Sequence, residues 1–182
     1  QAVAASRLGE KVTIAGKVGN DEFGNEFIET LNKENINTEY ILRDPVNSTG
    51  VGSVTLDRNG DNRIIVVPGA NLSFSSDDLN NIKELIKHST ILVVQLEMDI
   101  GMTEQAVAYA YANHVPVVLN PAPAQQLSDD LLSKVTYLTP NETEAEILTG
   151  YKVDSTEDAK VAGEILRNKG VQTVIITLAE EG

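Results

Sequence analysis

The stretch Tyr137-Leu-Thr-Pro-Asn-Glu-Thr-Glu-Ala-Glu-Ile-Leu148 changes from a strand pattern to a helix pattern at a single proline. Because Pro140 disfavours helical geometry in Thr139 and suits the first step of a new helix, a short strand ends here and a helix begins near Asn141. In open α/β sheets, ligands bind where a strand ends and the following helix begins. The exposed N–H groups at a helix start favour phosphate. The stretch therefore predicts a phosphate-binding corner at the edge of a parallel sheet.

Two side chains of this stretch have a second interpretation. Asn141 is a good helix N-cap, and Glu144 stands three residues later, which is the spacing of a capping box. Both residues could therefore serve only the helix. Glutamine can replace the glutamate in a capping box, but it brings no negative charge to a metal ion. The residues alone leave both interpretations open.

The composition is that of an ordinary globular chain long enough to bury a core in one or two domains. It has 182 residues, 41% of them hydrophobic, and no cysteine, so disulfides and thiolate chemistry are excluded. The net charge of −13 argues against nucleic acid or an anionic membrane as a partner. It does not exclude a phosphorylated ligand carried with Mg²⁺, because carboxylates help to hold that ion. No signal-like segment or long apolar run is present, which favours the cytoplasm.

Both ends of the sequence indicate a piece of a longer chain. Residues 1–8 already follow a helical pattern, without a methionine or a cap, and Gly182 comes just after a strand pattern. We therefore expect a fragment.

The second half of the chain alternates between strand and helix patterns from residue 90 to residue 177. Residues 90–95 read as a continuous apolar strand, the kind buried on both sides. Such alternation predicts a doubly wound α/β fold, in which helices cover both faces of a parallel sheet. With residues 1–37, residues 68–182 would form this main domain.

Residues 38–67 follow a different pattern. Three candidate strands, at residues 38–42, 50–56 and 62–67, follow one another with no helix between them, and Asn59-Gly60 marks a hairpin turn. We expect a small antiparallel sheet that stands apart from the main one, joined or not by part of the preceding segment.

The glycine-rich stretch Gly16-Lys-Val-Gly-Asn-Asp-Glu-Phe-Gly24 matches neither the P-loop nor the dinucleotide fingerprint. Tight turning is the expected purpose of its glycines. The helix that follows repeats apolar residues every three to four positions, which gives it one apolar side. These residues are Phe23, Phe27, Ile28 and Leu31.

Polar residues follow each predicted strand of the main sheet. The segments are Gln95-Leu-Glu97, Asn120-Pro-Ala-Pro-Ala124, Thr139-Pro-Asn-Glu-Thr-Glu144 and Thr177-Leu-Ala-Glu-Glu-Gly182. Because the carboxyl ends of parallel strands meet at one edge, these side chains suit a polar hydroxylated molecule beside a metal-bound polyphosphate. His88 and His114 fit helix-end and loop positions better than catalysis.

Four segments of the chain together resemble the PfkB carbohydrate kinases, in particular their ribokinase branch. The segments are Gly16-Lys-Val-Gly-Asn-Asp-Glu-Phe-Gly24, Val67-Pro-Gly-Ala-Asn71, Leu119-Asn-Pro-Ala-Pro-Ala124 and Leu138-Thr-Pro-Asn-Glu-Thr-Glu-Ala-Glu-Ile-Leu-Thr-Gly150. The last is similar to the family's Asn-x-x-Glu motif, which serves phosphate and Mg²⁺. The resemblance covers essentially the whole chain, and it favours the functional interpretation of Asn141 and Glu144.

The resemblance also implies roles for the other segments. Residues 38–67 would be a β lid over the sugar, with Gly52 and Val54 facing it, and the lids of two copies would pack into a homodimer. Glu97 matches the carboxylate that hydrogen-bonds a sugar hydroxyl, although it also fits a plain surface glutamate.

The nucleotide loop of the family begins at Thr177 and continues through Ala179 to Gly182. Ala179 departs from the glycine usual there, which puts close backbone approach to ATP in doubt. The ribose-binding glycine-rich segment would precede Gln1. The catalytic base, and most of the adenine and potassium sites, would lie beyond Gly182.

The function that the resemblance implies is ATP- and Mg²⁺-dependent phosphorylation of D-ribose at its 5-hydroxyl, with the 182 residues alone inactive. Two alternatives stay open. One is another kinase of the family, acting on fructose, a keto-deoxy sugar acid or a nucleoside. The other is a catalytically silent protein that binds sugar or nucleotide on the same scaffold.

Overall fold

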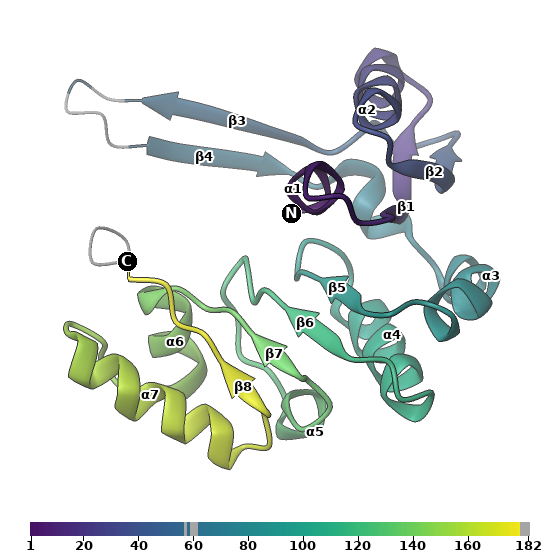
Figure 1. Cartoon of the computed structure of the whole chain (residues 1–182). Coiled ribbons are helices and arrows are strands. Elements are labelled where there is room, and N and C mark those ends of the chain that lie inside the picture. The colour runs from purple at the N-terminus through teal and green to yellow at the C-terminus, as the bar shows by residue number, and fades with distance from the viewer. Residues whose placement is uncertain (57, 59–61, 179–182) are drawn as a thin grey trace. The chain divides into compact units, whose positions relative to one another are not determined.

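The computed structural model describes residues 1–56, 58 and 62–178, and the chain divides into two compact units, Gln1–Asp78 and Leu79–Gly182. Figure 1 shows their helices and strands. None of the helices in the described ranges is both long and apolar enough to cross a membrane.

The first unit is built on a pair of parallel strands. β1 (Thr13–Gly19) pairs with β2 (Asn37–Asp44), and α2 (Glu22–Lys33) connects them, after a short α1 (Ala2–Arg7). Their core consists of Val18, Leu31, Ile36 and Ile41. The prediction of a small antiparallel sheet was therefore wrong for residues 38–42, because this strand pairs with β1 and in parallel.

The apolar side of α2 is only half covered. Leu31 is buried and Ile28 packs partly against the core, but Phe23 and Phe27 are exposed. Apolar periodicity shows a helix face but not what covers it.

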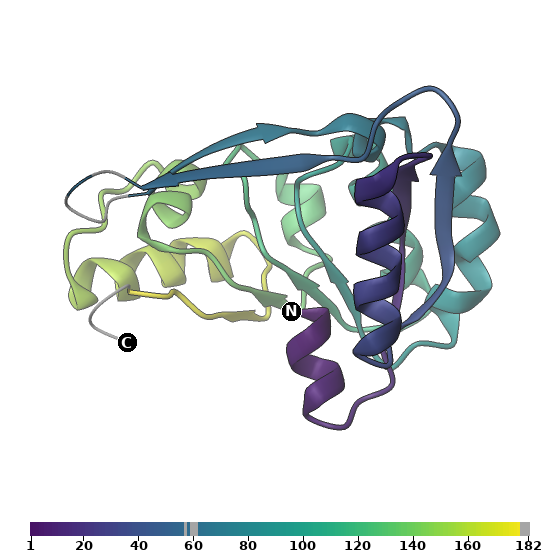
Figure 2. The ribbon, with the colours of Figure 1, turned by 90° about the horizontal axis from the view of Figure 1, so that it is seen from above.

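A long hairpin completes the strands of the first unit (Figures 1 and 2). β3 (Val51–Leu56) pairs antiparallel with β4 (Asn62–Val67), in a register that places Val54 opposite Ile64. The predicted Asn-Gly turn lies outside the described residues. A short helix, η1 (Gly69–Ser73), follows the hairpin.

The second unit contains four parallel strands in the order β5-β6-β7-β8. Helices connect them, so the predicted parallel α/β fold is confirmed. The strands are β5 (Leu92–Val94), β6 (Val117–Leu119), β7 (Tyr137–Leu138) and β8 (Thr173–Val174). The helices are α3 (Ser76–Lys87), α4 (Ile100–Ala112), α5 (Asp129–Leu132), α6 (Glu142–Thr149) and α7 (Thr156–Asn168).

The middle strands carry the core of this sheet. Val117, Leu119 and Leu138 are fully buried. The expectation that residues 90–95 are buried on both sides was wrong, because Ile91 and Val93 are exposed. These two residues stand two positions apart and share one face of the segment, which the described residues leave open.

Candidate active site at the carboxyl ends of strands β5 to β8

The predicted polar residues of the second unit lie along one edge of its sheet, which we call the rim. Glu97 follows β5, Asn120 follows β6, Asn141 follows β7 and Thr177 follows β8. Since the four strands are parallel, these positions share the carboxyl edge. Adjacent strands lie roughly 4.8 Å apart, so the ends of β5 and β7, which precede Glu97 and Asn141, are about 10 Å apart. That separation suits two neighbouring ligands, or two parts of one ligand.

Backbone hydrogen bonds extend the pairing beyond the strands and hold the rim in place. The Asn120 N–H donates to the Val94 carbonyl at 3.0 Å, and the Thr177 N–H donates to the Pro140 carbonyl at 3.0 Å. Asn141 and Thr177 also form a parallel β-bridge. The start of the α6 segment and the exit from β8 are therefore adjacent.

The corner at Asn141 is a complete capping box. The Glu144 N–H donates to Asn141 Oδ1 at 2.8 Å, and the Asn141 N–H donates to Glu144 Oε2 at 2.9 Å. The helix-cap interpretation is thus confirmed. It does not exclude a second role, because Asn141 is exposed at the rim even though Glu144 is only 9% exposed.

Two kinds of group at this corner remain available to a ligand. The N–H groups of Glu142 and Thr143, the first two residues of α6, have no hydrogen-bond partner within the described residues. Such groups at a helix start favour an anion. The second oxygen of Glu144, Oε1, also receives no hydrogen bond from the described part of the chain. The corner thus presents donors and one carboxylate oxygen side by side.

A magnesium ion fits this corner only with help from other ligands. Among the described residues, no three histidine, cysteine or acidic side chains gather closely enough to hold a metal. Mg²⁺ usually keeps several waters and takes one or two carboxylates together with substrate phosphates. One glutamate beside unpaired N–H donors matches that kind of site.

The candidate sugar-binding residues fall in both units. Glu97 is exposed, and no hydrogen bond to its side chain is formed by the described residues. Gly52 and Val54 lie on the hairpin, two positions apart on β3, and therefore share one of its faces. Space is open around Gly52, where an added Cβ would meet nothing within 4 Å. Ala179 and Gly182, predicted near the nucleotide, lie outside the described residues.

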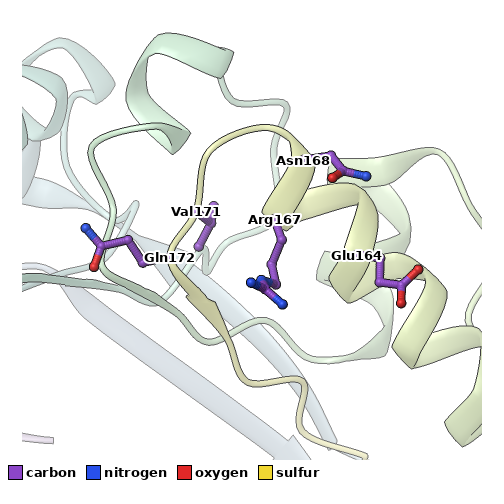
Figure 3. Close-up of a pocket in the computed structure, with 5 residues that line it drawn as sticks. All are labelled: Glu164, Arg167, Asn168, Val171 and Gln172. Atoms are coloured by element: carbon purple, nitrogen blue, oxygen red, sulfur yellow. The ribbon is translucent and has the colours of Figure 1, made fainter.

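Two hollows on the second unit border α7. One of about 400 Å³ is lined by Glu164, Arg167, Asn168, Val171 and Gln172 (Figure 3). Gln172 directly precedes β8, so this hollow opens at the amino end of the strand, opposite the rim. Another, of about 430 Å³, follows α7 past Val174 to Leu178. Because ligands in such sheets bind at carboxyl ends, the rim and not the first hollow is the candidate site.

Comparison with known proteins agrees with this architecture. The family model described as "pfkB family carbohydrate kinase" matches residues 1–182. The chain belongs to the PfkB family of carbohydrate kinases.

Individual PfkB kinases resemble the chain along all of its residues. A ribokinase of Haemophilus influenzae is 41% identical over 182 residues, which are 100% of this chain and 60% of that protein. A deoxyribokinase of Salmonella typhi is 37% identical over 183 residues, again 60% of its length. The structure of Arabidopsis thaliana ribokinase complexed with ribose and ATP superposes with a TM-score of 0.89 at 27% identity, covering 100% of this chain and 59% of that one. The chain thus spans about 60% of these relatives.

The sequence patterns did not reveal one polar cluster of the first unit. Asp21 is the N-cap of α2, and its carboxylate also accepts hydrogen bonds from Thr49, at the start of the hairpin. The hydroxyl and then the N–H of Thr49, followed by the Gly24 N–H, hold the pKa of Asp21 below its ordinary value. An aspartate before an apolar helix does signal a cap. No sequence signal points from it to Thr49, 28 residues later.

Proposed function

We propose that this chain is part of an ATP-dependent sugar kinase that transfers the γ-phosphoryl group of ATP to the 5-hydroxyl of D-ribose. The observation that carries the proposal is the rim, where an exposed carboxylate, Glu97, stands two strands away from the Asn141–Glu144 corner. The relatives named ribokinase, one of them complexed with ribose and ATP, support this choice of substrates.

Phosphoryl transfer depends mainly on positioning and on neutralising charge. When bound, Mg²⁺ and ATP would supply the phosphoryl group and much of that neutralisation. The unpaired N–H groups at the start of α6 would hold phosphate oxygens, and Glu144 Oε1 would help to hold Mg²⁺, while Oε2 keeps the cap. Glu97 accepts a hydrogen bond from a sugar hydroxyl and orients it. Thr177 and, beyond the described residues, Ala179 and Gly182 line the nucleotide.

In this proposal the hairpin supplies the lid. Residues 1–37 and 68–182 form the α/β kinase domain, which is incomplete in this chain. A lid excludes water that would otherwise hydrolyse ATP. The face with Gly52 and Val54 covers the sugar. The opposite face carries Val51, Ile65 and Val67, all exposed, and meets the same face of a second copy in a homodimer.

Three further features of the proposal rest only on the resemblance to the family. Activation by potassium, a cytoplasmic location and a catalytic base beyond Gly182 are expected from the resemblance. If the base lies there, the 182 residues alone form no ribose 5-phosphate, which a coupled assay on the purified piece would test.

A second substrate is favoured by a specific observation. A deoxyribokinase is nearly as similar to the chain as a ribokinase, at 37% against 41% identity. A panel of ribose, 2-deoxyribose, fructose and a nucleoside, tested on the full-length protein, would distinguish the sugars by kcat/KM.

The metal role of Glu144 is tested by Glu144→Gln in the full-length protein. Glutamine preserves the bond from the Asn141 N–H, so the melting temperature should stay nearly unchanged. Loss of the charge should lower Mg²⁺-dependent activity by about 10- to 100-fold. Glu146→Gln is the matched control, since it makes the same change on an exposed side chain of the same helix. Equal activity of both variants across a magnesium titration would reduce Glu144 to a cap.

A further inference from the structure

The two strands of the hairpin leave the first unit through a closely packed root, which consists of residues 48–50 and 68–70. The Ala70 N–H donates to the Ser48 carbonyl at 2.8 Å. A Cβ on Gly50 would lie 2.6 Å from the Pro68 carbonyl oxygen, and one on Gly69 would lie 2.3 Å from the Ser48 oxygen. The root is therefore a close contact of two backbone segments, which leaves no room for side chains at these glycines.

Asp21 ties this root to the turn between β1 and α2. Its Oδ2 accepts from the Thr49 N–H at 2.8 Å, and its Oδ1 accepts from the Thr49 hydroxyl at 2.6 Å and from the Gly24 N–H at 2.9 Å. The Thr49 hydroxyl in turn accepts from the Gly19 N–H at 2.9 Å. Thr49 is only 8% exposed, so water cannot readily replace these bonds.

The glycines of this turn serve close approach. A Cβ on Gly19 would lie 2.5 Å from the Thr49 nitrogen, and one on Gly24 would lie 2.6 Å from the Gly19 oxygen. Neither glycine has the positive φ that would require it for turning. The prediction that the glycines of this stretch serve tight turning was therefore wrong for these two positions.

The other end of the root is held by a second set of bonds. The buried carboxylate of Asp44 accepts from the hydroxyl of Ser73, the last residue of η1, and from the N–H groups of Val46 and Asn47. Lys17 on β1 donates to the Ser73 carbonyl at 3.0 Å and to Asp78 at 2.7 Å. The segments before and after the hairpin are thus bonded to β1, β2 and the turn that follows β1.

Beyond the root, the hairpin has little support of its own. Every residue of β3 is exposed, as are residues 64–67 of β4. An isolated two-stranded hairpin is marginally stable at best. The direction in which β3 leaves the unit is therefore set where Thr49 is held.

We infer that Asp21 is a positioning residue for the lid: by holding Thr49 it fixes the strand that carries Gly52 and Val54. The effect on sugar binding rests on the proposed function, whereas the hold on the hairpin does not.

The test is Asp21→Asn in the full-length protein. Asparagine caps a helix as well as aspartate does, so the bond from the Gly24 N–H survives. Its amide group would face the Thr49 N–H, donor against donor, and that bond is lost. Hydrogen exchange of the β3 amides should rise about tenfold, and the KM for ribose should rise about tenfold with kcat and the KM for ATP little changed.

Matched variants separate this role from general destabilisation. Asp158→Asn makes the same change on a carboxylate near the start of α7 that also accepts from a hydroxyl, and it should leave the hairpin unaffected. If Asp21→Asn does not fold, Thr49→Val serves as the test, because it removes only the hydroxyl. It should speed hydrogen exchange of the β3 amides, whereas Thr49→Ser, which keeps the hydroxyl, should leave their exchange as slow as in the wild type.

Unchanged exchange of β3 in Asp21→Asn and Thr49→Val would overturn the inference. Faster exchange of β3 in a variant that still phosphorylates ribose with an unchanged KM would also overturn it. Faster exchange in a protein that phosphorylates no ribose would sustain the hold of Asp21 on the hairpin and reject the proposed function instead.

Discussion

The parallel sheet and the hairpin use the same aliphatic residues in opposite ways. Leu138, in the middle of the sheet, is completely buried, whereas Leu56, on the hairpin, is 70% exposed. The sheet is covered by helices of its own chain. Both faces of the hairpin present valine, isoleucine and leucine outward.

This difference shows what each region depends on. Buried aliphatic groups stabilise the sheet within the chain, at roughly 25 cal/mol per Å² removed from water. The hairpin gains almost nothing from burial, so its placement depends on its root and on a partner or ligand. Exposed aliphatic patches of this kind mark interaction surfaces. The sheet thus provides stability, and the hairpin is the surface on which the proposed sugar and dimer contacts would form.

The largest expected effect separates the two leucines. Leu138→Ala should lower the free energy of unfolding by about 2–5 kcal/mol, because it leaves a cavity in the core. Leu56→Ala should change it by less than about 0.5 kcal/mol, since its side chain is already in water. Urea unfolding of both variants measures the comparison, and a similar loss in both would contradict it.

A second pair of substitutions compares the root with the hairpin beyond it. Gly69 has φ +52 and its Cβ would strike the Ser48 carbonyl, so Gly69→Ala should destabilise the protein by about 1–3 kcal/mol. Gly52→Ala meets open space and should leave thermal unfolding unchanged. If the face of Gly52 covers the sugar, this variant should instead raise the KM for ribose. Equal melting temperatures for the two variants would show that the root is not closely packed.

The sequence predicted most where one segment determines its own structure. The capping box at Asn141 and Glu144 followed from a spacing of three residues, and the structure has both of its hydrogen bonds. Alternating strand and helix patterns likewise predicted the parallel sheet. In each case the signal and the structure lie within a few residues of each other.

Predictions failed where the outcome depends on a distant partner. The pattern of residues 38–42 indicated a strand but not that it pairs with β1. The periodicity of α2 placed Phe23 and Phe27 on an apolar side, but what covers that side is not encoded in the helix. The bond from Asp21 to Thr49 joins segments 28 residues apart for the same reason. Pairing and burial are properties of the assembled chain.

A third, smaller effect tests whether the hairpin is an interface. On the face away from Gly52 and Val54, Ile65→Lys places a charge where a second copy is proposed to pack. Sedimentation of the full-length protein should show the dimer at least about tenfold weaker, which is roughly 1.4 kcal/mol. Tyr111→Lys, on the exposed side of α4, is the control and should change nothing. A dimer of undiminished strength in Ile65→Lys would place the interface elsewhere.

The smallest expected effect is the response of the root to acid. Bonds from the Asn47 N–H, the Ser73 hydroxyl and the Val46 N–H hold the pKa of Asp44 well below its ordinary value of 3.8. A carboxylate with a lowered pKa contributes stability that is fully present above the unfolded value and is lost as the pH falls toward the folded one. The wild type should therefore lose stability below about pH 4.

Asp44→Asn isolates this contribution, because asparagine cannot titrate and the neighbouring Asp21, Lys17 and Asp78 are kept. At pH 7 the variant should melt several degrees below the wild type, since it loses an acceptor for the Ser73 hydroxyl or for the N–H groups of residues 46 and 47. Between pH 4 and pH 2 the two melting curves should converge, because only the wild type loses its charge. A constant difference in melting temperature from pH 7 to pH 2 would mean that the Asp44 charge does not stabilise the root, and that only the shape of its side chain matters there.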